Sequence, residues 1–182
     1  MKRLVPLLLA LALPFAAFAT DYTVQPAAST LGFSGTFQGE AFQGQFGQWN
    51  AVIAYDPGNL AGSHFDVDVS LSSVKTGDSD RDSALPGPDF FNVAKFPKAH
   101  FVSTSIHKVG ATVVADGNLT MNGVTKPVIL DVAFKPQGIS ATLDVNGTVK
   151  RLDFGLGSGD YADTSVIGAA VKVTAHLQLA AK

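Results

Sequence analysis

The sequence predicts an all-β protein whose antiparallel strands close into a barrel of eight or nine strands. Apolar and polar residues alternate with a period of two in several stretches, which is the pattern of strands with one buried face. Short turn sequences rich in Gly, Pro, Asn and Asp separate these stretches, and short connections favour antiparallel neighbours. Closing the sheet removes exposed strand edges, although a two-sheet sandwich fits the same alternation.

The first element of the chain predicts export from the cytoplasm. A cationic start is followed by an almost wholly apolar run over residues 4–15, and Ala17-Phe18-Ala19 is a small-x-small pattern that a signal peptidase reads. The apolar run is shorter than the roughly 20 residues that span a bilayer. We therefore expect residues 1–19 to be a signal peptide cleaved after Ala19, and residues 20–182 to form one domain.

The strands follow in order, and the turns between them are short. Alternation is clearest in residues 65–72, 128–134, 139–149 and 171–179. Less regular strands are expected in residues 31–38, 42–55, 99–108 and 111–121. Turns are predicted at Asp56–Asn59, Asp116–Asn118, Asn122-Gly123 and Pro136–Gly138.

One stretch, residues 76–92, breaks the alternation and is expected to close an end of the barrel. It is acidic at first, then rich in Pro and Gly, and it ends near Phe90 and Phe91. A long connection in a barrel usually carries function or covers an end. We expect short helical turns near 79–84 and 88–92. The two phenylalanines then act either as a lid over the barrel mouth or as a hydrophobic plug.

The phase of the strands predicts which apolar side chains point inward. An eight-stranded barrel either fills with side chains or holds one small ligand, so the inward residues are candidates for both core and pocket. These candidates are Phe33, Phe37, Val67, Val69, Leu119, Met121, Leu130, Val132, Phe134, Leu143 and Val145. Phe42, Phe46 and Trp49 are expected to line the opposite part of the pocket or to serve as packing.

Composition and motifs exclude several classes of function. The absence of Cys removes thiol catalysis, iron–sulfur clusters and a disulfide framework, and a net charge of −2 argues against nucleic acid as a partner. The sequence contains no nucleophile elbow, phosphate loop or dinucleotide fingerprint. A calcium-loop template fails because Ser83 stands where that loop requires glycine. We expect no catalytic residue, no metal and no cofactor other than a bound lipid.

Six short motifs occur in order along nearly the whole exported chain. They are Ser29–Phe33, Gly44–Gly47 with Tyr55–Pro57, Ser73–Thr76 with Arg81-Asp82, Asp89–Pro97, Gly117–Val128 and Arg151–Gly155. Together these motifs resemble the YceI-like family of bacterial periplasmic proteins, whose domain is also called polyisoprenoid-binding.

The resemblance implies a lipocalin-like, eight-stranded barrel in the periplasm that binds or carries an isoprenoid lipid. Quinones and polyprenyl lipids are the ligand class that it suggests, and a homodimer is a further expectation. The alternative is a non-enzymatic accessory module of a membrane redox or stress system. Such a module would have a plugged barrel and a partner such as a membrane cytochrome.

Arg151 is the most informative polar residue, because the phase of Leu143, Val145 and Val149 places it on the inward side near a strand end. A buried guanidinium requires carboxylate or carbonyl partners. The motifs make Arg81, Asp82, Asp89, Arg151 and Asp153 the candidate polar end of the pocket. We expect Arg151 to tie the acidic stretch to the barrel end. In the alternative, Arg151 contacts the polar head of a ligand.

Overall fold

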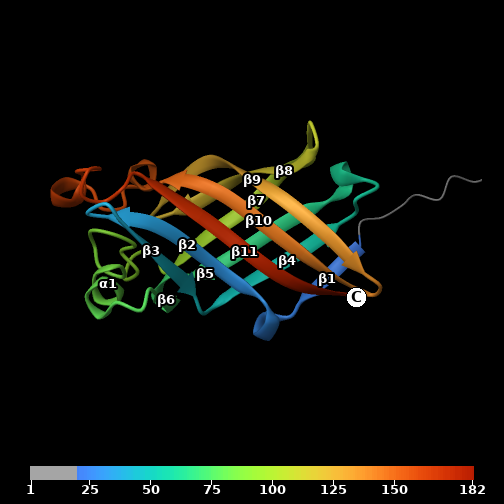
Figure 1. Cartoon of the computed structure of the whole chain (residues 1–182), viewed down its shortest axis with the longest axis horizontal. Coiled ribbons are helices and arrows are strands. Elements are labelled where there is room, and N and C mark those ends of the chain that lie inside the picture. The colour runs from blue at the N-terminus through green and yellow to red at the C-terminus, as the bar shows by residue number, and fades with distance from the viewer. Residues whose placement is uncertain (1–19) are drawn as a thin grey trace, which may run out of the picture.

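Eight strands form a closed antiparallel barrel in the computed structural model of the protein, which describes residues 20–182 (Figure 1). The barrel order is β1-β4-β5-β7-β8-β9-β10-β11, and β11 pairs again with β1. Their bounds are β1 Thr20–Val24, β4 Trp49–Tyr55, β5 His64–Ser70, β7 Lys98–Val109, β8 Thr112–Met121, β9 Val124–Gln137, β10 Ser140–Lys150 and β11 Ala170–Ala181. This closure confirms the predicted barrel over the sandwich. The predicted signal peptide lies outside the described residues.

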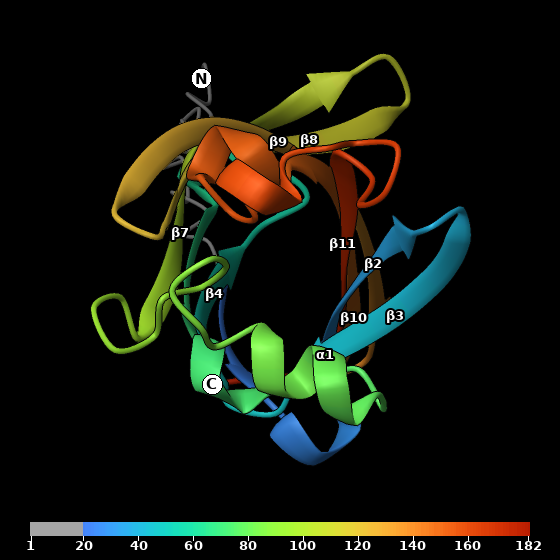
Figure 2. The ribbon, with the colours of Figure 1, turned by 90° about the vertical axis from the view of Figure 1, so that its left-hand side faces the viewer.

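Three further strands widen one end of the barrel. They are β2 Thr30–Phe37, β3 Glu40–Phe46 and β6 Val74–Lys75. β1 pairs with the last residues of β11, and β2 pairs with an earlier part of the same strand. The turn η1 (Pro26–Ala28) lies between β1 and β2. β3 pairs with β2, and its last two residues pair with β6. Figure 2 shows the β2–β3 hairpin extending outward at the end of the barrel that faces the viewer.

The strands differ from the sequence-based expectation at three places. β1 was not predicted, and the expected strand 42–55 is interrupted at Gly47-Gln48. The predicted turn Asp116–Asn118 is wrong, because these residues lie inside β8. Gly117 faces a bulge in β7, and a Cβ there would lie 2.4 Å from the ring of Phe101. Gly117 therefore makes room for an aromatic ring and does not form a turn.

Two hydrophobic clusters fill the barrel at different levels. The first contains Tyr55, whose ring lies 4.6 Å from that of Phe134 and 6.1 Å from that of Phe65, measured between centroids. The second cluster includes Leu71, Phe91, Met121 and Phe154. Full burial of one such side chain contributes about 1.5–3 kcal/mol, so both clusters stabilise the barrel strongly.

Loops and short helices cover the wide end of the barrel. α1 (Ser79–Ala84) is capped by Asp78, whose carboxylate accepts a hydrogen bond from the Arg81 amide at 2.9 Å. The helical turn expected near 79–84 is therefore present, whereas 88–91 form a non-helical turn. The 3₁₀ turns are η1, η2 Leu60–Gly62, η3 Leu71–Ser73, η4 Arg151–Phe154 and η5 Gly159–Tyr161. Within residues 20–182, no helix is both long and apolar enough to span a bilayer.

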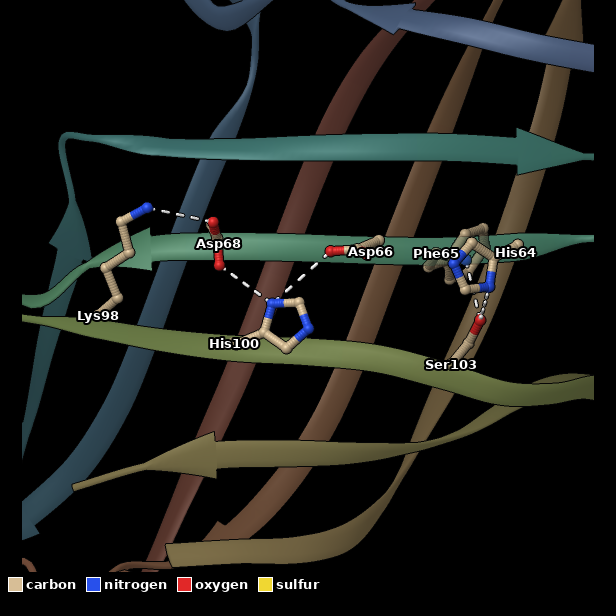
Figure 3. Close-up of polar contacts among 7 residues, drawn as sticks. All are labelled: His64, Phe65, Asp66, Asp68, Lys98, His100 and Ser103. Atoms are coloured by element: carbon tan, nitrogen blue, oxygen red, sulfur yellow. Dashed lines mark hydrogen bonds and ion pairs between the residues drawn. The ribbon is translucent and has the colours of Figure 1, made fainter. Parts of the chain in front are cut away.

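Polar side chains on β5 and β7 gather on the outer surface of the barrel (Figure 3). Asp68 accepts hydrogen bonds from His100 at 3.0 Å and from Lys98 at 3.3 Å. The His100 contact, followed by that of Lys98, holds the pKa of Asp68 below its usual value.

At the β7 bulge, the buried Ser103 hydroxyl accepts a hydrogen bond from the Phe65 amide at 2.9 Å. A side chain thus satisfies a backbone donor that the irregular strand leaves unpaired.

Candidate functional site

An apolar cavity of about 240 Å³ occupies the barrel interior. Its wall draws on both hydrophobic clusters and on the loops of the wide end. Pairs of residues two apart, such as Val67 and Val69 on β5 or Leu143 and Val145 on β10, line it because alternate side chains of a strand share one face. The wall offers shape and apolar contact, with almost no hydrogen-bonding groups, so it suits a hydrocarbon chain.

Aromatic rings shape the part of the cavity beneath the β2–β3 hairpin. The Phe33 ring lies 5.4 Å from that of Phe46, and the Phe46 ring lies 6.0 Å from that of Phe91. Gly44 stands opposite Phe33 in the ladder, and a Cβ at this glycine would lie 2.4 Å from the Phe33 ring. The missing side chain lets Phe33 lie against β3, which fixes one wall of the cavity.

The cavity brings together most of the predicted apolar residues. Those on its wall are Phe33, Phe42, Phe46, Trp49, Val67, Val69, Phe90, Phe91, Leu119, Met121, Leu130, Leu143 and Val145. Phe90 and Phe91 come from the segment that covers the wide end, so they lie where a lid would lie. The guanidinium of Arg81 lies above the Phe42 ring, 4.3 Å from its centroid, in a cation–π contact.

Three predicted lining residues do not lie on the wall of this cavity. Phe37 is 41% exposed, because the β2–β3 hairpin extends past the closed part of the barrel. Val132 is buried in the first cluster. Phe134 packs between Tyr22 and Tyr55. The strand phase predicts an inward direction correctly for the last two, but it does not predict the depth at which the cavity ends.

More than half of the residues on the wall were not predicted from the sequence. Some missed residues continue a regular alternation that was available, as Ala51 and Ile53 do on β4 and Val171, Val173 and Ala175 do on β11. Others come from loops without any period. These are Leu85, Leu156, Ile167 and Gly168. Only the first group carried a signal that could have identified it.

Arg151 is 4% exposed and lies at the wide end of the cavity. Its Nε donates to two carbonyls at 3.2 and 3.3 Å, and each Nη donates to two carbonyls at 2.8–2.9 Å. The acceptors belong to Leu156, Gly157, Tyr161, Ile167 and Gly168. All five N–H groups of the guanidinium are therefore used. The geometry favours an anchor for residues 151–168 and leaves no donor for a ligand head.

The predicted carboxylate partners of Arg151 are wrong. Asp82 instead accepts hydrogen bonds from the amide and hydroxyl of Thr76 at 2.6 and 2.7 Å, and the hydroxyl contact in particular lowers the pKa of Asp82. The carboxylates of Asp89 and Asp153 are exposed. The acidic stretch is joined to the Arg151 segment by backbone instead, since the Gly157 amide donates to the Asp89 carbonyl at 2.6 Å. Of the two kinds of partner expected for a buried guanidinium, Arg151 therefore uses carbonyl oxygens.

Comparison with known proteins agrees with this architecture. Residues 22–179 match the family model of the YceI-like domain. A UPF0312 protein of Yersinia pestis (strain Pestoides F) is 39% identical over 119 residues, which are 62% of this chain and 62% of that protein. The match therefore spans less than two thirds of the length of the curated relative.

Solved structures share the fold over most of the chain. The crystal structure of Burkholderia cenocepacia BcnA has a TM-score of 0.82 and 27% sequence identity, covering 86% of this chain and 99% of that chain. A polyisoprenoid binding domain from Saccharophagus degradans, implicated in plant cell wall breakdown, has a TM-score of 0.69 and 19% identity. It covers 90% of this chain and 99% of that chain, and this likeness shows the fold alone.

Proposed function

The chain belongs to the YceI-like family, and from this membership and the apolar cavity we propose that it binds and carries an isoprenoid lipid. The chain of a quinone or polyprenyl lipid would lie inside the barrel, against the aliphatic and aromatic wall. The cavity is the observation that carries this proposal, because a branched hydrocarbon chain matches a wall almost devoid of polar atoms. Each buried CH₂ group contributes about 0.8 kcal/mol to binding.

Two further points support a carrier. An open interior favours lipid binding over the alternative of an accessory module with a plugged barrel, even though aromatic side chains fill one end. The structural relative from Saccharophagus degradans is itself described as a polyisoprenoid binding domain. We place the carrier in the periplasm because of the export signal predicted at residues 1–19. A homodimer and a membrane cytochrome partner remain hypotheses for the same compartment.

Native mass spectrometry of protein purified from the periplasm, followed by solvent extraction and lipid identification, tests the proposal. We expect one prenyl lipid or quinone per barrel. Protein that carries no lipid, and that keeps its apo mass after incubation with quinones and polyprenyl lipids, contradicts it. That result would favour the interaction module.

A further inference from the structure

A second hollow lies on the outside of the barrel and shares part of its wall with the cavity. It is a groove of about 360 Å³ lined by η1, the start of β2, the end of β3 and the start of β4. Leu31, Phe46 and Trp49 line both the groove and the cavity. The partition between the two spaces is therefore one layer of side chains.

The strand pairing explains why the wall is thin at this place. β1 pairs with β4 only through Ile53, Ala54 and Tyr55, so the first four residues of β4 pair with β5 alone. β2 pairs with β11 and β3, and in residues 20–182 no ladder joins β2 or β3 to β4. The link Gly47-Gln48 between β3 and β4 is held by backbone hydrogen bonds to Ser70 and Ser73. Toward β2, by contrast, no ladder spans the gap, and the side chains of Leu31, Phe46 and Trp49 border it.

The groove combines apolar side chains with polar, uncharged ones. Thr30, Gln45 and Gln48 line it with exposed side chains that make no hydrogen bond within the described residues. The hydroxyl of Ser29, which also lines it, already donates to the Gln25 carbonyl and accepts from the Gln178 amide. A hydroxyl and two amides offer both donors and acceptors. The nearest cation along the ladder is Lys75, opposite Gln45, and it does not line the groove. At the wide end, by contrast, the donors of Arg151 are all used by carbonyls.

We propose that this groove binds the polar head of a lipid whose isoprenoid chain passes between Leu31, Phe46 and Trp49 into the cavity, and that the head is uncharged. A quinone carbonyl or a prenol hydroxyl fits a groove of amide and hydroxyl groups, whereas a phosphate would lack a cationic partner. The inference rests on the proposed lipid-binding function. It adds that the head group lies in the outer groove and carries no charge.

Isosteric variants of the groove test where the head lies. The probes are a menaquinone with a geranylgeranyl chain, geranylgeranyl phosphate, and phytane, a hydrocarbon without a head. We expect the double variant Thr30→Val/Gln45→Leu to bind the menaquinone about tenfold more weakly than the wild type, since it loses two hydrogen bonds. Phytane binding should be unchanged, which also shows that the variant is folded. The matched control is Thr148→Val/Gln43→Leu, which alters exposed residues of β10 and β3 outside both hollows.

Tryptophan fluorescence gives a second, independent readout. Trp49 is the only tryptophan of the chain and lines both hollows. A quinone ring in the groove, or in the adjoining part of the cavity, lies against Trp49, so one equivalent of menaquinone should quench most of the emission and phytane should not. Weaker quenching in Thr30→Val/Gln45→Leu than in the control variant at the same menaquinone concentration assigns the ring to the groove.

The outcomes separate the two proposals. If none of the three probes binds the wild type, both the lipid-binding function and the head-group site are wrong. If menaquinone binds but the groove variant and the control bind it equally, the head lies elsewhere and only the present inference is overturned. If geranylgeranyl phosphate binds more tightly than menaquinone, and Lys75→Gln removes that preference, the head is anionic and the inference is also overturned.

Discussion

Five carbonyl oxygens surround the guanidinium of Arg151 and fix residues 151–168 across the wide end of the barrel. Replacing Arg151 with Met keeps the length of the side chain but leaves these buried acceptors without donors. We expect Arg151→Met to lower the free energy of unfolding by roughly 3 kcal/mol. Urea denaturation measures the change. Lys150→Met, at the exposed neighbouring position, is the control and should change stability by less than about 0.5 kcal/mol. Equal midpoints for the two variants would contradict the anchor role.

Ser103 is a second residue whose side chain replaces a backbone partner. Ser103→Ala leaves the Phe65 amide at the β7 bulge without its acceptor. Because this amide is buried, we expect a loss of about 1–3 kcal/mol in the free energy of unfolding. Ser105→Ala, two residues away on the exposed side of the bulge, should be nearly neutral. Hydrogen exchange at Phe65 offers a local check, and protection that persists in Ser103→Ala would rule out this account.

At the scale of elements, the outer ladder of β5 and β7 predicts a small dependence of stability on pH. The pKa of Asp68 is lowered in the folded protein, so its contribution is present above the unfolded value of about 4 and is lost as pH falls through the folded pKa. Since Asp68 is exposed to solvent, we expect Asp68→Asn to cost less than about 1 kcal/mol at pH 7.

The same experiment should show a difference between wild type and Asp68→Asn that shrinks as the pH falls through the lowered pKa of Asp68, because the carboxyl group then becomes protonated in the folded state as well. Asp131→Asn, at an exposed position of β9, is the control for removing a charge. A stability difference for Asp68→Asn that grows as pH falls would have the wrong sign and would refute the assigned cause.

Some strands and site residues could be predicted from the sequence, and others could not. Alternation predicted β5, β10 and β11, because each has one face in the interior and one in water. It did not predict β1, which is only five residues long and depends on β4 and β11 for its pairing. Within the site, phase identified inward residues such as Val69 and Leu119. The loop residues Leu85 and Leu156 could not be found, because tertiary packing alone brings them to the cavity.

At the scale of the whole molecule, the interior is divided into a filled end and an open part. A bulky side chain in the open part should therefore displace ligand without unfolding the barrel. We expect Val145→Phe, on the cavity wall, to reduce retention of a prenyl lipid at least about tenfold. Asn146→Phe adds the same ring to the exposed face of β10 and should retain lipid. Extraction and quantification of the bound lipid distinguish them, and equal retention would place the ligand outside the cavity.

The pairing of β1 with β11 also has a consequence for the time order of folding. Tyr22 lies opposite Ala181, so strands from the two ends of the described chain complete the ring. During synthesis, the ring cannot close until β11 has left the ribosome or the translocation channel. Until then, β1, β2 and β10 each present an edge without its final partner. Contacts so distant in sequence slow folding to the millisecond-to-second range. The nascent chain therefore cannot enclose the barrel interior before its last strand is available.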